Sequence, residues 1–172
     1  FHMTLEQVNN AQNSDSVSHL KIRYAKYQYN LGIQLGMLNN NFSLPIRVYY
    51  QDTDAGGVVY HSTYLNFMER ARYEWLRVLG FNVNSLIEIQ KIFFMVRSLE
   101  IEYFKPAVLD DLLNVTVAVA EIGRSRITLS QEILCNHVKL VSATIHVVCV
   151  GAEKLKPVSI PVPLREKIGK FA

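Results

Sequence analysis

The residues best suited to chemistry lie in one short stretch, residues 52–61, which reads DTDAGGVVYH. It holds two carboxylates, a glycine pair and a histidine. A carboxylate can attack a carbonyl carbon or activate a water molecule for that attack. The adjacent glycines, Gly56 and Gly57, let the backbone approach a ligand closely. This combination predicts acyl transfer, provided that something nearby stabilises the oxyanion.

A helix directly after this stretch would supply that stabilisation. Between residues 62 and 79 the polar residues recur at helical spacing as a narrow stripe, which predicts a helix buried over most of its circumference. Ser62 or Thr63 can cap its first turn, and Gly80 can end it. The unpaired N–H groups of a first turn carry partial positive charge, so they can hold negative charge on a carbonyl oxygen.

The elements around this helix read as strands. One short strand precedes the loop, and four strands with alternating apolar residues follow the helix, at residues 46–50, 94–104, 112–122, 126–135 and 139–150. The links between the last four are short, which predicts an antiparallel meander. One long helix and one sheet bury their apolar faces most simply when the sheet curls around the helix. We therefore predict an α+β fold in one domain, residues 44–172.

Residues 1–43 differ in composition from the rest. They are rich in Asn, Gln, Ser and Tyr and show no sustained apolar period. We expect an N-terminal extension with at most a short helix near residues 17–35, partly disordered or the artefact of an upstream start.

The overall composition fits one globular domain and excludes several classes of protein. The chain has 172 residues, 49% of them hydrophobic, and a net charge of +3 with scattered basic residues, which argues against nucleic-acid binding. No apolar run reaches the ~20 residues of a transmembrane helix. Cys135 and Cys149 fall roughly 30 Å apart on consecutive predicted strands, too far for a disulfide. With no export signal either, we expect a cytoplasmic protein.

Two longer runs carry a family resemblance, VYYQDTDAGGVVYHSTYLNFMERARYEWLRVLGF and MVRSLEIEYFKPAVLDDLL. Together they resemble the hotdog-fold acyl-CoA thioesterases of the 4-hydroxybenzoyl-CoA thioesterase family, in particular the Tol–Pal-cluster (YbgC-like) branch. The resemblance covers about residues 44–165, and its DTDAGGVVYH string is far more specific than a single pair of aspartates. It implies a hotdog fold and hydrolysis of acyl-CoA or acyl carrier protein thioesters to a free acid and a thiol.

The resemblance also implies roles for loop residues. Asp54 matches the catalytic carboxylate of the family, acting as nucleophile or as general base, although an isolated aspartate beside glycine would only form a turn. His61 matches a position whose backbone N–H faces the thioester oxygen. Its imidazole could steady the substrate, relay a proton, cap the helix or merely pack. Gly57, Val58 and Tyr60 are expected to border the substrate.

The same resemblance implies partners beyond the loop. Arg124, Ser125 and Arg126 sit in a predicted strand turn where the adenosine diphosphate of coenzyme A could lie. In the family two chains pair edge to edge with the site between them, which implies a homodimer or homotetramer here. Association with cell-envelope or lipid-synthesis proteins would follow from the family alone. We expect no metal and no cofactor, since the sequence has neither zinc-ligand clustering nor a Walker loop.

Several nearby residues have simpler interpretations. Asp52 is expected to accept backbone N–H bonds within the loop. Glu69 resembles a helix carboxylate that other hotdog thioesterases use, but it lies about 10 Å along the helix from its start. Pairing with Arg72 or Tyr73 explains Glu69 more simply. Tyr50, like Tyr60, could line an acyl pocket or belong to the core.

Two other functions compete with thioester hydrolysis. Aspartate-nucleophile phosphoryl transfer would use the DxD pattern with Asp110 and Asp111, but it needs parallel βα units around magnesium, which one helix and a meander do not provide. A non-catalytic hotdog protein that binds acyl-CoA would show binding without turnover. We predict the thioesterase.

Overall fold

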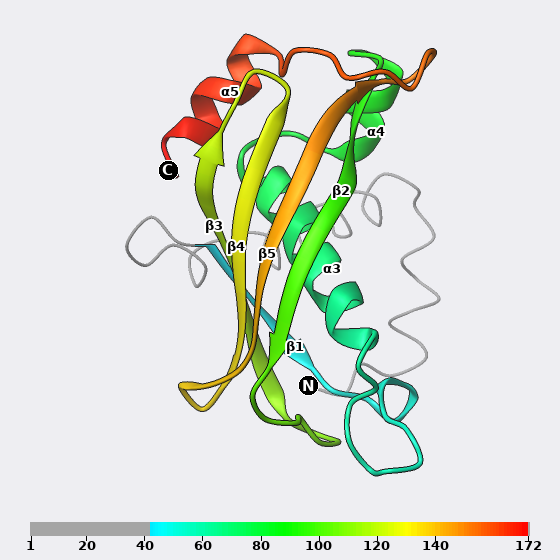
Figure 1. Ribbon diagram of the computed structural model, residues 1–172, viewed down its shortest axis with the longest axis vertical. Helices are drawn as coiled ribbons and strands as arrows, with labels where there is room; N and C mark the ends of the chain where they lie inside the picture. The colour runs from blue at the N-terminus through cyan, green and yellow to red at the C-terminus, as the bar shows by residue number, and fades with distance from the viewer. Residues whose placement is uncertain (1–41, 172) are drawn as a thin grey trace, which may run out of the picture. The chain divides into compact units, whose positions relative to one another are not determined.

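A computed structural model describes residues 42–171 (Figure 1). Its elements, in chain order, are β1 (Phe42–Arg47), the 3-10 helix η1 (Tyr50–Asp52), α3 (Thr63–Val78), α4 (Val83–Glu88), β2 (Ile92–Tyr103), β3 (Leu112–Ile122), β4 (Arg126–Cys135), β5 (Val138–Gly151) and α5 (Val162–Gly169). The extension predicted for residues 1–43, with its short helix near 17–35, lies outside the described residues, apart from Phe42 and Ser43, which belong to β1.

The strands form one antiparallel sheet in the order β1-β3-β4-β5-β2, which confirms the predicted α+β class. The β3-β4-β5 part is a meander, as predicted. Its last turn uses Asn136 and His137, both with positive φ (48° and 65°), as a tight hairpin turn requires.

The predicted meander is wrong for β2, which pairs with β5 at one edge of the sheet rather than with β3. The reason lies in the link between β2 and β3. Instead of turning back as a hairpin, the link joins the edge strand β2 to β3, which lies beyond β5 and β4 in the sheet, and it pairs with the loop before α3. Val58 and Val108 form an isolated β-bridge, and the N–H of Val59 donates to the carbonyl of Ala107.

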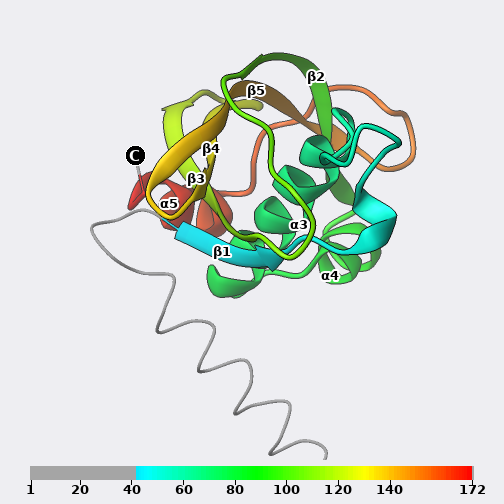
Figure 2. The same ribbon diagram turned by 90° about the horizontal axis from the view of Figure 1, so that it is seen from below.

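Helix α3 lies inside the curve of the sheet (Figure 2). Its buried side chains share the face toward the strands: Tyr64, Phe67, Met68, Ala71, Trp75 and Leu76. Its opposite face stays exposed at Asn66, Glu69, Arg70 and Tyr73. The exposed residues thus form one narrow stripe at positions of the predicted polar stripe, and the rest of the helix circumference is buried or half-buried, as predicted.

The ends of α3 differ in how they are stabilised. Ser62 occupies the N-cap position but its side chain makes no capping hydrogen bond, contrary to the expected cap. At the other end Gly80 adopts a φ of 85°, and the ammonium of Lys167 donates to the carbonyl of Leu79 at 2.7 Å. A cation near the C-terminus of a helix also interacts favourably with its dipole. Helix α5, which contributes Lys167, was not predicted from the sequence.

Strand β2 is an edge strand, and within residues 42–171 no strand pairs with its outer side. Met95 and Val96 on this strand are nearly half exposed, at 46% and 45%. The register with β5 shifts between Val96 and Ser98, so Arg97 is the extra residue of a β-bulge. Bulges bend a strand and can redirect a side chain.

Candidate active site

The loop before α3 doubles back on itself, so that residues 52–53 and residues 59–60 form its two paired arms. Its arms are held by the bridge between Thr53 and Val59, and by the N–H of Tyr60, which donates to the carbonyl of Asp52 at 3.0 Å. The carboxylate of Asp52 is buried and accepts the N–H of Tyr49 at 2.8 Å. Asp52 therefore has the structural role predicted for it. This bond belongs to η1, which replaces the end of the predicted strand 46–50.

Asp54 lies at the tip of the loop and is exposed. Its Oδ1 accepts the N–H of Gly56 at 2.7 Å, and its backbone is fixed by bonds to Val58 and Gly57. Within the described residues Oδ2 accepts no hydrogen bond, so one carboxylate oxygen is held and the other is available. Gly57 has a φ of 75°, a conformation that a side chain would strain, which explains a glycine at that position.

Neighbouring segments hold the base of the loop. The N–H of Ala107 donates to the phenol oxygen of Tyr64 on α3 at 2.9 Å, and the carbonyl of the same residue accepts the N–H of Val59. Ala107 is fully buried. Burial raises the pKa of Tyr64 above its ordinary value. The link between β2 and β3 thus ties the loop to the helix that follows it.

The start of α3 presents backbone N–H groups next to this loop. The carbonyl of Tyr60 accepts the N–H of Thr63 at 2.8 Å, and the carbonyl of His61 accepts the Tyr103 hydroxyl at 3.0 Å. Within residues 42–171 the N–H groups of His61 and Ser62 have no acceptor. The His61 ring is exposed and lies 4.4 Å from the Tyr60 ring, centroid to centroid. Its imidazole makes no hydrogen bond to the described residues, so it does not cap the helix.

The predicted coenzyme A residues, Arg124, Ser125 and Arg126, line an open hollow of about 600 Å³ on the other face of the sheet from α3. Arg124 is anchored there, because its Nε donates to Ser159 Oγ at 2.8 Å. Arg97, the bulged residue of β2, also lines the hollow. Sequence reasoning missed Arg97, since a bulge leaves no signal in an alternating pattern.

The structure does not bring this hollow together with Asp54 in one chain. The loop lies at the Leu112 end of β3, where Arg47 pairs with Leu112, while the hollow follows Ile122 at the other end. At about 3.3 Å per residue the length of β3 separates them by roughly 30 Å. Figure 1 shows the loop at the lower end of the sheet and the β3–β4 turn at the upper end.

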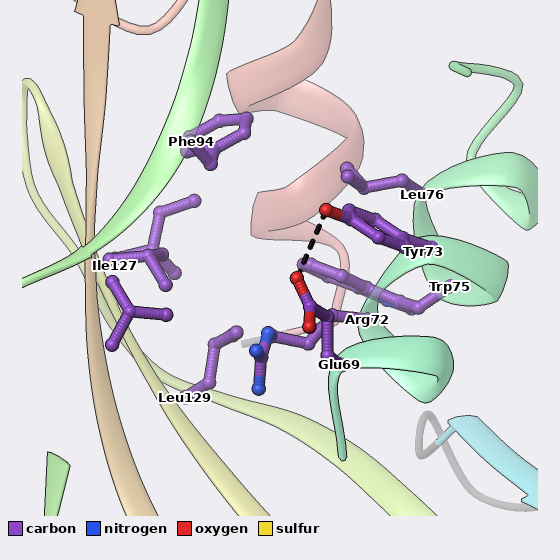
Figure 3. Close-up of a pocket in the computed structure, with 10 residues that line it drawn as sticks. Glu69, Arg72, Tyr73, Trp75, Leu76, Phe94, Ile127 and Leu129 are labelled. Carbon is purple, nitrogen blue, oxygen red and sulfur yellow. Dashed lines mark hydrogen bonds between the residues drawn. The ribbon is translucent and has the colours of Figure 1, made fainter. Parts of the chain in front are cut away.

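A second cavity, of about 110 Å³, lies between α3 and the sheet (Figure 3). The strands give it an apolar wall that includes Phe94, Ile127 and Leu129, and the helix contributes polar side chains. The Tyr73 hydroxyl donates to Glu69 Oε1 at 3.1 Å, which confirms one of the two pairings expected for Glu69.

The other expected pairing of Glu69, with Arg72, does not form a hydrogen bond. Arg72 instead donates to Oε1 of the buried Gln131 at 2.8 Å, and Gln131 Nε2 donates to the carbonyls of Met68 and Thr116. Burial lowers the pKa of Arg72, with nearby Glu69 opposing that effect. Tyr50 takes no part in this cavity, because its side chain is 83% exposed.

No metal site, membrane-spanning helix or disulfide is found in the part of the chain that the structure describes. Residues 42–171 contain no group of three or more His, Cys, Asp or Glu side chains arranged to hold a metal ion. Among the helices described, none is both long and apolar enough to cross a membrane. Cys135 and Cys149 are free thiols on β4 and β5.

The amino-acid sequence is similar to a family of thioesterases and to individual members of it. Residues 48–168 match the family model described as Thioesterase-like superfamily. The chain is 50% identical over 125 residues to the acyl-CoA thioesterase YbgC of Haemophilus influenzae, covering 73% of this chain and 92% of that protein. It is 41% identical over 121 residues to the acyl-CoA thioester hydrolase YbgC of Escherichia coli O6:H1, covering 70% of this chain and 90% of that protein.

The fold is also similar to that of a thioesterase of known structure. The probable thioesterase from Bartonella henselae superimposes with a TM-score of 0.68 at 38% identity, covering 70% of this chain and 99% of that one. The hotdog fold implied by the sequence resemblance is therefore confirmed.

Proposed function

The chain belongs to the thioesterase-like superfamily and is a thioesterase, and from that membership we propose that it hydrolyses acyl-CoA thioesters to a free acid and coenzyme A, with Asp54 as the reacting carboxylate. One observation carries the assignment to Asp54. Its carboxylate is exposed at the tip of a glycine loop, with Oδ1 held by Gly56 and Oδ2 without a partner among the described residues.

Two chemical routes are open to this carboxylate. As a nucleophile, Oδ2 attacks the thioester carbonyl carbon, the carbon–sulfur bond breaks, and water then hydrolyses the resulting anhydride. As a general base, the carboxylate takes a proton from water while the water oxygen attacks the same carbon. In either route the thiolate leaves and the carbonyl oxygen becomes negative in the transition state.

The amides at the start of α3 are the proposed donors to that oxygen. The N–H groups of His61 and Ser62 are without acceptors in the described chain, and they lie at the positive end of the helix dipole. Gly57, Val58 and Tyr60 border the same loop and are proposed to contact the substrate. For His61 we assign the backbone rather than the imidazole, because the ring makes no hydrogen bond that would orient it for proton transfer.

The cavity between α3 and the sheet is proposed to receive the apolar part of the acyl group. Its walls are apolar on the strand side, and it begins at Glu69, about 10 Å along the helix from Ser62 at 1.5 Å per residue. A cavity of comparable volume can hold a small apolar molecule.

The nucleotide of coenzyme A is proposed to lie in the hollow lined by Arg97, Arg124, Ser125 and Arg126. Guanidinium groups recognise phosphates well, because their donors match phosphate oxygens in pairs. The roughly 30 Å between this hollow and Asp54 implies that the two belong to one site only when a second chain supplies one of them.

Strand β2 is the proposed contact between the two chains. Its outer edge is unpaired within residues 42–171, and exposed edges tend to pair with another strand. In an antiparallel β2–β2 pair the second chain runs in the opposite direction to the first. The hollow of the second chain would then approach the Tyr103 end of β2 in the first chain, where His61 and the loop lie. The proposed enzyme is thus a homodimer, or a homotetramer built from two such dimers.

The test is the release of thiol and free acid by the wild-type protein from short, long and aromatic acyl-CoAs. The same acyl groups on acyl carrier protein and on N-acetylcysteamine, which lacks the nucleotide, form the comparison arms. Turnover of at least one acyl-CoA, faster than of its nucleotide-free counterpart, is the expected result. Saturable binding of acyl-CoA without any turnover would instead support the non-catalytic binding protein.

A further inference from the structure

Tyr103, the last residue of β2, connects the edge of the sheet to the start of α3. Its hydroxyl donates to the carbonyl oxygen of His61 at 3.0 Å, across 42 positions of sequence. Its ring packs edge-on against the ring of Tyr64, with 5.7 Å between centroids. The ring contact and the hydroxyl contact are separable, because phenylalanine would keep the first and lose the second.

The hydroxyl contact fixes the direction of a backbone N–H. A peptide unit is planar and trans, so its carbonyl and its N–H point in opposite directions. The bond from Tyr103 to the His61 carbonyl therefore also sets the direction of the Ser62 N–H. The preceding peptide is fixed in the same way, because the Tyr60 carbonyl accepts the N–H of Thr63 and so sets the direction of the His61 N–H.

Both peptides are thus held through their carbonyls, while their N–H groups have no acceptor within residues 42–171. This is the arrangement expected of an oxyanion site, since donors that are already oriented need no reorganisation when charge develops. The side chain of Ser62 makes no capping bond to the first turn, so it does not occupy these amides.

We propose that Tyr103 is a positioning residue for the reaction, whose hydroxyl holds the His61–Ser62 peptide so that the Ser62 N–H faces the thioester oxygen. The inference rests on the proposed thioesterase mechanism but names a residue on a different element from the loop. Burial raises the pKa of the Tyr103 phenol, so it stays protonated and remains a donor in neutral solution.

The test is Tyr103→Phe, measured in steady-state hydrolysis of the best acyl-CoA and in thermal unfolding. Loss of one orienting hydrogen bond should lower kcat about tenfold, with KM changed less than about twofold and the unfolding midpoint lowered by no more than about 4 °C. Tyr49→Phe is the matched control, since Tyr49 is 64% exposed and its hydroxyl has no partner among the described residues. It should leave kcat, KM and the midpoint at wild-type values.

Three outcomes would overturn the inference: kcat of Tyr103→Phe within twofold of wild type, a change confined to KM, or a loss of kcat matched by Tyr49→Phe. A fall in kcat that circular dichroism traces to unfolded protein at the assay temperature would assign Tyr103 a purely structural role and overturn the inference as well. The proposed function fails differently, by an absence of turnover in the wild-type protein itself.

Discussion

The Oδ1 atom of Asp54 accepts a hydrogen bond from the N–H of Gly56 at 2.7 Å. This bond orients the carboxylate from two residues away and leaves Oδ2 without a partner in the described chain. Gly56 is also the place where an added side chain would interfere most directly, because a Cβ there would lie 3.0 Å from Asp54 Oδ1. The glycine thus serves both as the donor to the carboxylate and as the space that the carboxylate needs.

Gly56→Ala should therefore reduce activity without unfolding the protein. The methyl group would push the Asp54 carboxylate from its position by a few tenths of an ångström. Since a displacement of about 1 Å can cost about 100-fold in rate, the smaller shift should lower kcat by less than that, about tenfold. The measurement is kcat for an acyl-CoA, with circular dichroism to confirm folding. Gly169→Ala is the control, since a Cβ at Gly169 meets nothing within 4 Å. Equal kcat values for the two variants would contradict the role given to Gly56.

Arg97→Gln should weaken binding of nucleotide-bearing substrates. Removing one guanidinium from the hollow should raise KM for acyl-CoA about fivefold, corresponding to about 1 kcal/mol, and reduce the sensitivity of KM to salt. Hydrolysis of the N-acetylcysteamine thioester should be unaffected because it carries no phosphate.

Arg165→Gln, on the exposed side of α5, is the matched charge control for Arg97→Gln. An equal rise in KM for both variants would show that the change in net charge, and not the position of Arg97, causes the effect. An equal rise on both substrates would place Arg97 outside the nucleotide site.

Tyr64→Phe should destabilise the fold rather than change the chemistry selectively. The phenol oxygen is the acceptor for the N–H of the fully buried Ala107, and an unpaired buried N–H costs about 1–3 kcal/mol. The free energy of unfolding in urea should fall by that amount. Tyr73→Phe removes a phenol from the exposed side of the same helix and should have a much smaller effect. Equal losses in the two variants would contradict the importance given to the Ala107 bond.

Stability should fall as pH rises from about 9 toward 11, and Cys149 should be one cause. Burial raises the pKa of its thiol from 9.0 to about 11. The unfolded chain then loses this proton at lower pH than the folded one, so stability is fully present below about pH 9 and is lost above it. In urea unfolding at several pH values, Cys149→Val should reduce the decline. A decline of unchanged steepness would rule the thiol out.

The sequence predicted those elements whose side chains alternate or recur over a long enough run. The bounds of β3 and β4 agree with the expected 112–122 and 126–135, because one face of each strand lies against α3 and the pattern follows that burial. Helix α3 was predicted for the same reason. The short helix α4, from Val83 to Glu88, gives too few turns for a period to be visible.

The sheet order and part of the site were not predictable in this way. Alternation places residues on a face but says nothing about which strand is the neighbour, so β2 was assigned to β3 rather than β5. The bulge that leaves Arg97 unpaired and the contact between Tyr103 and His61 depend on that pairing. The loop around Asp54 was recognisable because its glycines and carboxylates are adjacent in sequence.

The central claim is that the Asp54 carboxylate carries out the reaction, and Asp54→Asn tests it most directly. Asparagine keeps an oxygen that can accept the Gly56 N–H, so the loop should stay folded while the reacting group is lost. Asp110→Asn, an exposed aspartate on the β2–β3 link, is the matched control. With thiol release from an acyl-CoA as the readout, Asp54→Asn should lower kcat about 100-fold or more, and Asp110→Asn should leave it near the wild-type value. Near wild-type turnover by a folded Asp54→Asn protein would contradict the account.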